Sequence, residues 1–165
     1  MELPASTRCA DPAAAVAQLL TRVIQAVKAV AIARRVIRQN GSELVMLPSF
    51  PVAGKSTSAV IELSTRSEMV ESADDETESL VAKPTSESSK VAGAIAGRTR
   101  QGEEVQLVAR GKESVLVAVE SLARALSYLK NEQSLLVAPR FIESEVPGEQ
   151  DPVTFLCFDM IPHPL

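Results

Sequence analysis

The chain has 165 residues, of which 45% are hydrophobic but only 3% aromatic, so a packed core must be built from Val, Ile, Leu and Ala side chains. Such a core is typical of small helices packed on a short sheet. The formal net charge is -4, the opposite of the balance that a dedicated nucleic-acid-coating protein usually carries. The acidic residues gather between Glu68 and Glu78, and the remainder is close to neutral. The charge therefore disfavours nucleic-acid binding but does not exclude it.

Two cysteines, Cys9 and Cys157, lie near opposite ends of the chain, without a Cys/His cluster at metal-ligand spacing. We therefore expect no metal site, no cofactor and no disulfide framework. The first eight residues lack the basic region and apolar run of a secretory signal. The longest apolar stretches are broken by Lys28, Arg34 and Arg35, so we expect no membrane span and a soluble, cytoplasmic protein.

One long helix, or two helices run together, is predicted over residues 13–38. Asp11-Pro12 is a favourable helix start, because Asp caps free amides and Pro is tolerated in the first turn, and Asn40-Gly41 marks the end. Further helices are predicted at Lys90–Arg100 and Ser114–Lys130. Strands are predicted at Glu43–Leu47, Ser58–Leu63, Leu80–Ala82, Glu104–Ala109, Ser134–Ala138 and Val153–Asp159.

Three local features sharpen this prediction. Two strands are expected to close at Pro48 and Pro139, since proline cannot donate to a sheet ladder. Gly93 and Gly97 share one helix face, which would permit very close packing against a sheet or another helix. Cys157 alternates with Phe155 on its strand and is expected in the core.

The chain contains an internal repeat, in which two segments match at an offset of roughly eighty to ninety residues. We name residues 1–64 the first repeat and residues 80–165 the second repeat; the acidic residues 65–79 between them are predicted to be a flexible linker. The matched segments are 13–22 with 91–100, 23–35 with 115–127, 43–50 with 134–141, and 58–64 with the final strand. The second repeat is predicted to run β-α-β-α-β-β.

The two repeats differ at Arg22–Val23, where the first lacks any counterpart of residues 101–114 and their central strand. Either the first repeat fused its two helices and lost that strand, or the given chain omits residues that the native chain has. A missing central strand would leave backbone groups that something else must satisfy.

Residues 25–34 (QAVKAVAIAR) and 91–97 (VAGAIAG) resemble the two helix motifs of the stage V sporulation protein S family. A strand ending in Pro-x-Phe follows in each repeat, at Pro48–Phe50 and Pro139–Phe141. The resemblance implies tandem Alba-like α/β modules, a fold whose members commonly bind DNA or RNA as dimers. It also implies a small non-enzymatic regulator. Two repeats in one chain resemble a covalent, intramolecular pseudo-dimer.

The chain departs from the family motif where positive charge matters, because Glu120 takes the lysine position of the second repeat and Leu126 its arginine position. Basic residues nevertheless remain on or beside the predicted helices, and they are the candidate contacts for nucleic acid or a protein partner. They are Lys28, Arg34, Arg35, Arg38, Arg98, Arg100, Arg110 and Lys112. The alternative interpretation is a solvated helix rim.

No catalytic residues are predicted. His163 lies between two prolines at the tail, where a catalytic histidine would lack an orienting partner. Residues 53–56 (AGKS) resemble the end of a phosphate-binding loop but precede a predicted strand instead of the helix such a loop needs, so a hairpin loop is favoured.

These observations favour a non-enzymatic protein–protein interaction or scaffolding module that docks into a larger assembly, with sheet edges open to strand addition. A cytoskeletal or ciliary structural role would suit such a chain if it is eukaryotic. The alternative hypothesis is an Alba-like DNA- or RNA-binding regulator.

Overall fold

The computed structural model describes residues 12–49, 60–71 and 78–165, with side chains in the first helix from Thr21 onward. The mixed α/β fold predicted from the sequence is confirmed, with three helices and six strands in this part of the chain. The elements are α1 (Pro12–Gln39), β1 (Glu43–Ser49), β2 (Val60–Arg66), β3 (Leu80–Ala82), α2 (Ser88–Arg100), β4 (Val105–Ala109), α3 (Lys112–Leu129), β5 (Ser134–Ser144) and β6 (Val153–His163). The AGKS segment at 53–56 lies outside the described residues.

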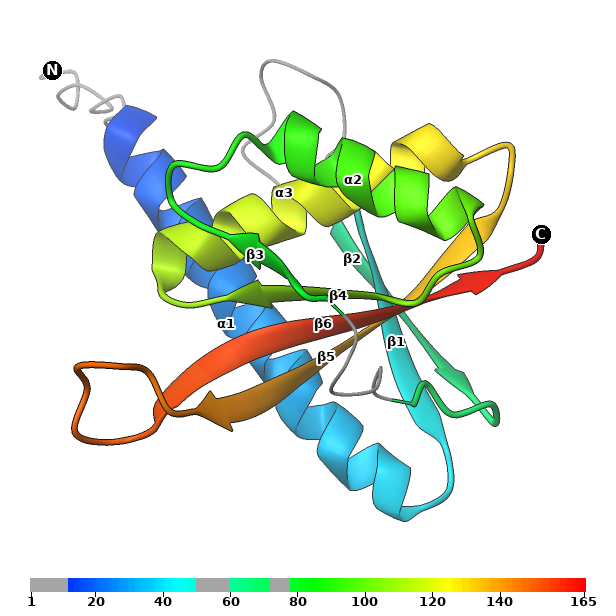
Figure 1. Cartoon of the computed structure of the whole chain (residues 1–165), viewed down its shortest axis with the longest axis horizontal. Coiled ribbons are helices and arrows are strands. Elements are labelled where there is room, and N and C mark those ends of the chain that lie inside the picture. Colours follow the sequence, from blue (N-terminus) through cyan, green and yellow to red (C-terminus); the bar gives the residue numbers. More distant parts are fainter. Residues whose placement is uncertain (1–11, 50–59, 72–77) are drawn as a thin grey trace, which may run out of the picture.

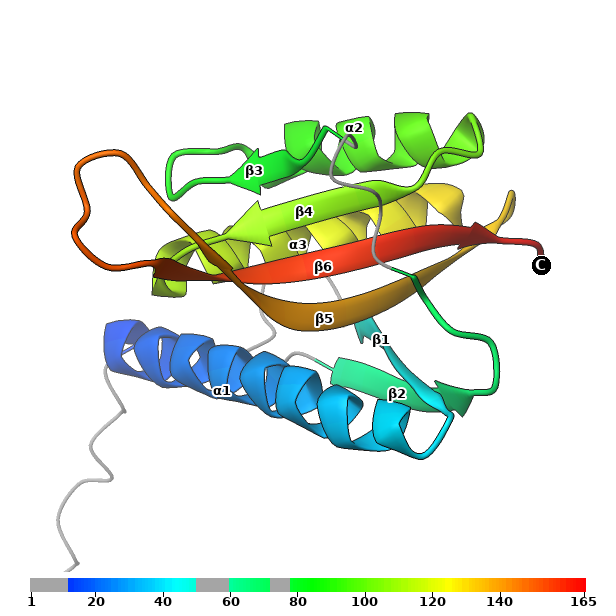
Figure 2. The ribbon, with the colours of Figure 1, turned by 60° about the horizontal axis from the view of Figure 1, so that its bottom comes forward.

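The six strands form a single sheet in the order β2-β1-β5-β6-β4-β3, with β3 parallel to β4 and the other neighbours antiparallel (Figure 1). Figure 2 shows α1, β1 and β2 below β5, and β6, β4, β3 and α2 above it. The two repeats are thus joined side by side through β1 and β5, and the sheet continues from one into the other.

The hairpins of the two repeats have the same register. Met46 pairs with Leu63 in the β1–β2 hairpin, and its repeat counterpart Val137 pairs with Met160 in the β5–β6 hairpin. Where the repeats meet, Met46 lies directly opposite Val137. Since these two residues are matched by the repeat, the repeats contact each other at equivalent positions.

Helix α1 runs without a break through Arg22–Val23 in the given chain. At the equivalent place the second repeat has the additional residues 101–114, which contain β4, and this strand pairs with β6. Among the described residues, β2, the counterpart of β6, has β1 as its only sheet neighbour. The first repeat therefore consists of one long helix and one hairpin.

The main core lies between the helices and one face of the sheet. Val27 of α1, Leu122 of α3, Met46 and Phe158 belong to one buried cluster, which explains why a chain so poor in aromatic residues still packs a continuous interior. No helix in the described part of the chain is long and apolar enough to cross a membrane.

The opposite face of the sheet has a smaller cluster of Val45, Leu136, Ala138 and Val70, with Ile161 against it. These strand residues alternate with the main-core residues, as the two-residue period of a strand requires. Val70 falls in the segment predicted to be a flexible linker, yet it is 1% exposed. The prediction of a flexible linker is wrong at Val70, because this apolar side chain packs on the apolar face of the sheet.

Two further expectations are corrected. Strands β1 and β5 continue through Pro48 and Pro139 instead of closing there. The two strands pair with each other only at Met46 and Val137, so beyond that point each has a free side where a missing N–H costs no ladder bond. His163 ends β6 opposite Ser134 instead of lying in a solvated tail.

The glycines of α2 do not serve close packing. A Cβ atom added at Gly93 or Gly97 would meet nothing within 4 Å, because the buried residues of α2 are Ala92, Ile95, Ala96 and Thr99. The close contact expected from this glycine spacing is absent, and the glycines lie away from the packed side of α2.

This arrangement predicts that Gly93→Ala and Gly97→Ala each stabilise the fold by about 1 kcal/mol, since alanine suits a helix interior better than glycine. The free energy of unfolding from urea titration measures the change. Gly111→Ala is the matched control: Gly111 has φ of 83°, where an added side chain is strained, so this variant should lose stability. A loss of stability at Gly93 or Gly97 would contradict the open environment.

Candidate functional site

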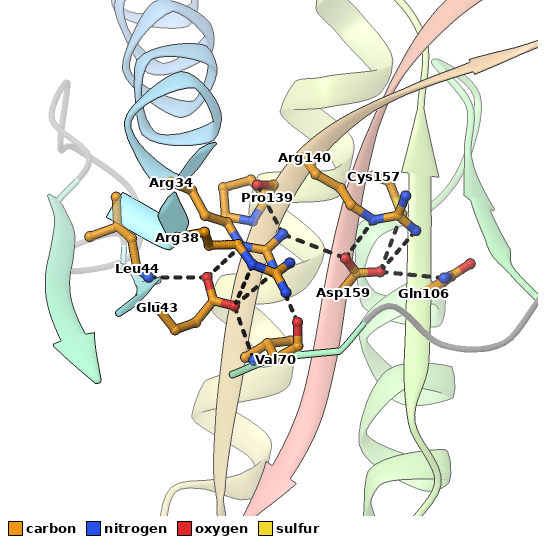
Figure 3. Close-up of polar contacts among 10 residues, drawn as sticks. All are labelled: Arg34, Arg38, Glu43, Leu44, Val70, Gln106, Pro139, Arg140, Cys157 and Asp159. Carbon is orange, nitrogen blue, oxygen red and sulfur yellow. Dashed lines mark hydrogen bonds and ion pairs between the residues drawn. The ribbon is translucent and has the colours of Figure 1, made fainter. Parts of the chain in front are cut away.

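The most concentrated polar chemistry of the molecule is a buried cluster of charges around Arg34 (Figure 3). Arg34 extends the buried side of α1 that carries Val27, Val30 and Ala31, and it is 2% exposed. Its Nε donates to Oε1 of Glu43 at 2.6 Å and its Nη2 to Oε2 at 3.0 Å. This is a bidentate pair, the strongest geometry available to arginine and a carboxylate.

A second carboxylate, Asp159 of β6, stands on the other side of Arg34. Its Oδ2 is 3.7 Å from Nη1 of Arg34, and it accepts a 2.6 Å hydrogen bond from Nε of Arg140. Gln106 of β4 donates to Oδ1 of Asp159 at 3.3 Å, and the thiol of Cys157 lies 3.7 Å from the same oxygen. Asp159 therefore links three strands of the second repeat to the helix of the first.

The cluster also holds the segment that follows β2. The Val70 amide donates to Oε2 of Glu43 at 3.0 Å, and the Val70 carbonyl accepts from Nη2 of Arg34 at 3.1 Å. Both polar groups of this buried residue's backbone are thus satisfied by the ion pair itself. The side chain of Val70 covers the sheet while its backbone is fixed by the charges beside it.

The environment shifts two pKa values. Burial by itself would raise the pKa of Glu43, but the hydrogen bonds and charge of Arg34, with help from the Val70 amide and Arg38, hold it below its ordinary value. Burial and the neighbouring Asp159 raise the pKa of the Cys157 thiol to about 12. Glu43 is therefore ionised at neutral pH, and Cys157 is a protonated, unreactive thiol, buried as the sequence predicted.

The cluster contains contacts between the two repeats, from Arg34 to Asp159 and to the Pro139 carbonyl. Surface hollows of about 490 Å³ beside Arg98 and about 230 Å³ beside Leu126 share no residue with the cluster. Among the described residues, no group of three His, Cys, Asp or Glu side chains could hold a metal ion. Each carboxylate of the cluster is paired with a guanidinium of the same chain, Glu43 with Arg34 and Asp159 with Arg140.

The structure separates the eight basic residues that the sequence singled out. Arg34 is buried and cannot reach a phosphate, and Nε of Arg38 is 3.7 Å from Glu43. Arg98 pairs with Glu78, Arg100 with Glu132, and Arg110 with Glu149. Lys28, Arg35 and Lys112 are exposed and form no ion pair with another described residue. Five of the eight are thus neutralised by carboxylates of the same chain.

Sequence reasoning missed Glu43, Asp159 and Arg140. A signal was present, because Glu43 opens the apolar run ELVML and Asp159 interrupts the apolar run FLCFDMI. A carboxylate inside such a strand must be paired if it is buried. The pattern did not identify the partner: Arg34 lies 9 residues from Glu43 along the chain, but 105 residues from Pro139, whose carbonyl it also reaches.

The repeat offers a test of the ion pair, because the counterparts of Arg34 and Glu43 in the second repeat are Leu126 and Ser134. Arg34→Leu alone leaves the buried Glu43 with only Arg38, 3.7 Å away, as a cation and should cost roughly 3 kcal/mol, with a similar loss for Glu43→Ser. The double variant should cost less than the two losses together, because neither charge remains alone. Urea unfolding of the four proteins measures this coupling, and additive losses would contradict it.

Stability should also depend on pH through Glu43. Its folded pKa is lowered, so the pair contributes stability above the unfolded pKa of about 4.3, and this contribution is lost as the pH falls through the folded value. The difference in unfolding free energy between wild type and Glu43→Gln should be widest near neutral pH and narrow below about pH 5. Glu132→Gln, at an exposed pair, is the control and should show a much smaller difference. A pH-independent gap for Glu43→Gln would refute the assignment.

Comparison with known proteins adds the family. A search of curated proteins finds no match. The family model described as stage V sporulation protein S (SpoVS) matches in two segments, residues 8–65 and 78–162, which correspond to the two repeats. These segments include both helix motifs and both hairpins. The family is not a known enzyme family. The chain therefore belongs to the stage V sporulation protein S (SpoVS) family, which it represents in two tandem, Alba-like segments.

Proposed function

We propose that this protein is a non-enzymatic interaction module that docks onto protein partners in a larger assembly. The observation that carries the proposal is the uncovered first repeat. In the second repeat, α2 packs against α3 and β4 pairs with β6. In the first repeat the counterpart of α2 is the beginning of α1, and β4 has no counterpart. Among the described residues, its hairpin edge therefore lacks the strand that covers β6, and its helix exposes the apolar side chains of Ile32 and Val36.

The helix surface is a stripe of Ala29, Ile32, Ala33 and Val36, spaced as one face of α1. Ile32 is 60% exposed and Val36 56%. The repeat counterparts of Ala29 and Ala33 are Ser121 and Ala125, which are fully buried on α3. The counterparts of Ile32 and Val36 are Arg124 and Tyr128, which are exposed and more polar. The first repeat thus carries exposed apolar side chains where the second carries polar ones, which is typical of a docking surface, and a helix with a small-residue face, like α2, would fit it.

The proposal includes an intramolecular pseudo-dimer. The pairing of Met46 with Val137, two equivalent residues, supports it, since a two-fold contact brings the same position of each partner together. The Arg34–Asp159 contact crosses the same boundary. Such a unit would present one covered and one uncovered half to its assembly, in the cytoplasm or in a cytoskeletal or ciliary structure.

Nucleic-acid binding is the second candidate, and Lys28, Arg35 and Lys112 favour it. Lys28 and Arg35 are exposed on α1, where an Alba-like module could meet phosphates. Against it, Arg98, Arg100 and Arg110 are engaged by carboxylates, and the net charge is -4. A binding surface built on these three exposed cations would give weak affinity that falls with salt.

One experiment separates the two candidates. The tagged protein is isolated from its source cells, and the proteins that remain bound are compared between wild type and Ile32→Glu. We expect Ile32→Glu to lose bound protein at least tenfold, because a charge in the apolar stripe must be desolvated on docking. Arg124→Glu, at the counterpart position on α3, is the matched control and should retain it.

The same wild-type protein is titrated with mixed DNA and RNA across a salt series, with fluorescence anisotropy as the measurement. Absence of binding at low salt supports the interaction module. Micromolar or tighter binding that weakens with salt and is lost on Lys28→Glu/Arg35→Glu would instead establish the nucleic-acid function.

A further inference from the structure

The outer edge of β2 is the second surface that the first repeat leaves uncovered. β2 is the terminal strand of the sheet, and its side chains are exposed or half-buried along its whole length. Leu63 is 50% exposed, whereas Met160, its counterpart on β6, is 1% exposed. Val60 is 51% exposed, and its counterpart Cys157 is fully buried. The same hairpin register thus gives a buried strand in one repeat and an open strand in the other.

The second repeat shows what such an edge accepts. On β6, the side that is open in β2 is occupied by β4, which pairs in the antiparallel sense from Val105↔Met160 to Ala109↔Leu156. An edge strand presents unpaired N–H and C=O groups that can form the same ladder with another chain. The fold therefore already contains an antiparallel strand at the equivalent place.

The charged side chains of β2 are complementary to those of the same strand in a second molecule. If two β2 strands pair antiparallel with Ser64 opposite Ser64, then Glu62 of each molecule lies opposite Arg66 of the other. Leu63 then lies opposite Thr65, so no like charges face each other. Opposite charges at directly paired positions stabilise a strand pair, and like charges destabilise it.

Arg66 lacks a partner that this arrangement would supply. It forms no ion pair with a described carboxylate, and its Nε is the one buried side-chain nitrogen or oxygen atom in the described residues without a hydrogen-bond partner. The rest of this half-buried guanidinium can donate to a carboxylate of a second molecule, in a charge-assisted hydrogen bond.

We propose that the β2 edge binds a second molecule of this protein, β2 to β2 and antiparallel about Ser64, with two Glu62–Arg66 pairs across the interface. The inference rests on the proposed function in taking the first repeat as a protein-binding surface. The sheet becomes continuous through both molecules, and the α1 stripe stays available to other partners.

Site-specific disulfide cross-linking tests the pairing. In a Cys9→Ser background, Ser64→Cys places two cysteines directly opposite each other, with Cα atoms about 5 Å apart, a separation that a disulfide spans. Cys157 stays in place, because it is buried and its pKa of about 12 keeps it unreactive. Glu62→Cys is the control: its thiol is four residues from its own copy along the strand, or ~13 Å.

We expect Ser64→Cys to form a covalent dimer under mild oxidation at least tenfold faster than Glu62→Cys. Equal rates at the two positions, or no dimer at Ser64→Cys, would overturn the proposal. Light scattering of the wild-type chain gives an independent measurement: we expect twice the 17.6 kDa of one chain at micromolar concentration, and a monomer would count against the pairing.

Charge reversal separates the edge from the rest of the surface. Glu62→Arg places the new arginine of each molecule directly opposite Arg66 of the other, and we expect this repulsion to raise the dimer dissociation constant roughly tenfold or more. Val81→Lys, at the exposed β3 edge, should leave the dimer unchanged. If the protein is monomeric but Ile32→Glu still abolishes the binding of partner proteins, the β2 pairing is refuted and the proposed function is retained. Nucleic-acid binding by an intact dimer would refute the proposed function alone.

Discussion

The buried guanidinium of Arg34 is the charge through which the two repeats meet, because it pairs with Glu43 in the first repeat and reaches Asp159 and the Pro139 carbonyl in the second. The side chains of Arg34 and Glu43 are almost fully withdrawn from water, so neither charge can be left without the other. Because Arg34 also approaches Asp159 and binds the Val70 carbonyl, one side chain ties together α1, β6 and the segment after β2. The contacts of Arg34 therefore help to fix the position of the first repeat relative to the second.

This constraint explains why the repeats diverged in different ways. The first repeat keeps the arginine of the family helix motif, and there it serves as a buried cross-brace. The second repeat has Leu126 at that position and Ser134 in place of Glu43, so it has no equivalent charge pair. Its own helix instead packs along α2 over small buried residues such as Ala125. Both repeats share one apolar core, and the first repeat adds a buried charge cluster at its boundary with the second.

Loss of the central strand has a structural consequence beyond the missing element. A module with all its strands buries the hairpin edge under β4, as the contrast between Met160 and Leu63 demonstrates. Helix α1 has a core side, with Val27 and Val30 buried, while Ile32 and Val36 on its other side are exposed among the described residues. The first repeat therefore stays folded through its partner repeat while it keeps two uncovered surfaces, an open strand edge and an apolar helix face.

The sequence by itself determined the elements, the repeat and the family, because these follow from local patterns: apolar periodicity, the Asn40-Gly41 stop, and the helix motifs at 25–34 and 91–97. It also placed Cys157 in the core. Only the tertiary structure decided that Arg34 is buried, that Val70 packs within an acidic run, and that the glycines of α2 face open space. The physical reason is that the burial of a charge and the packing around a glycine are set by residues far away along the chain, and a local sequence pattern does not contain those residues.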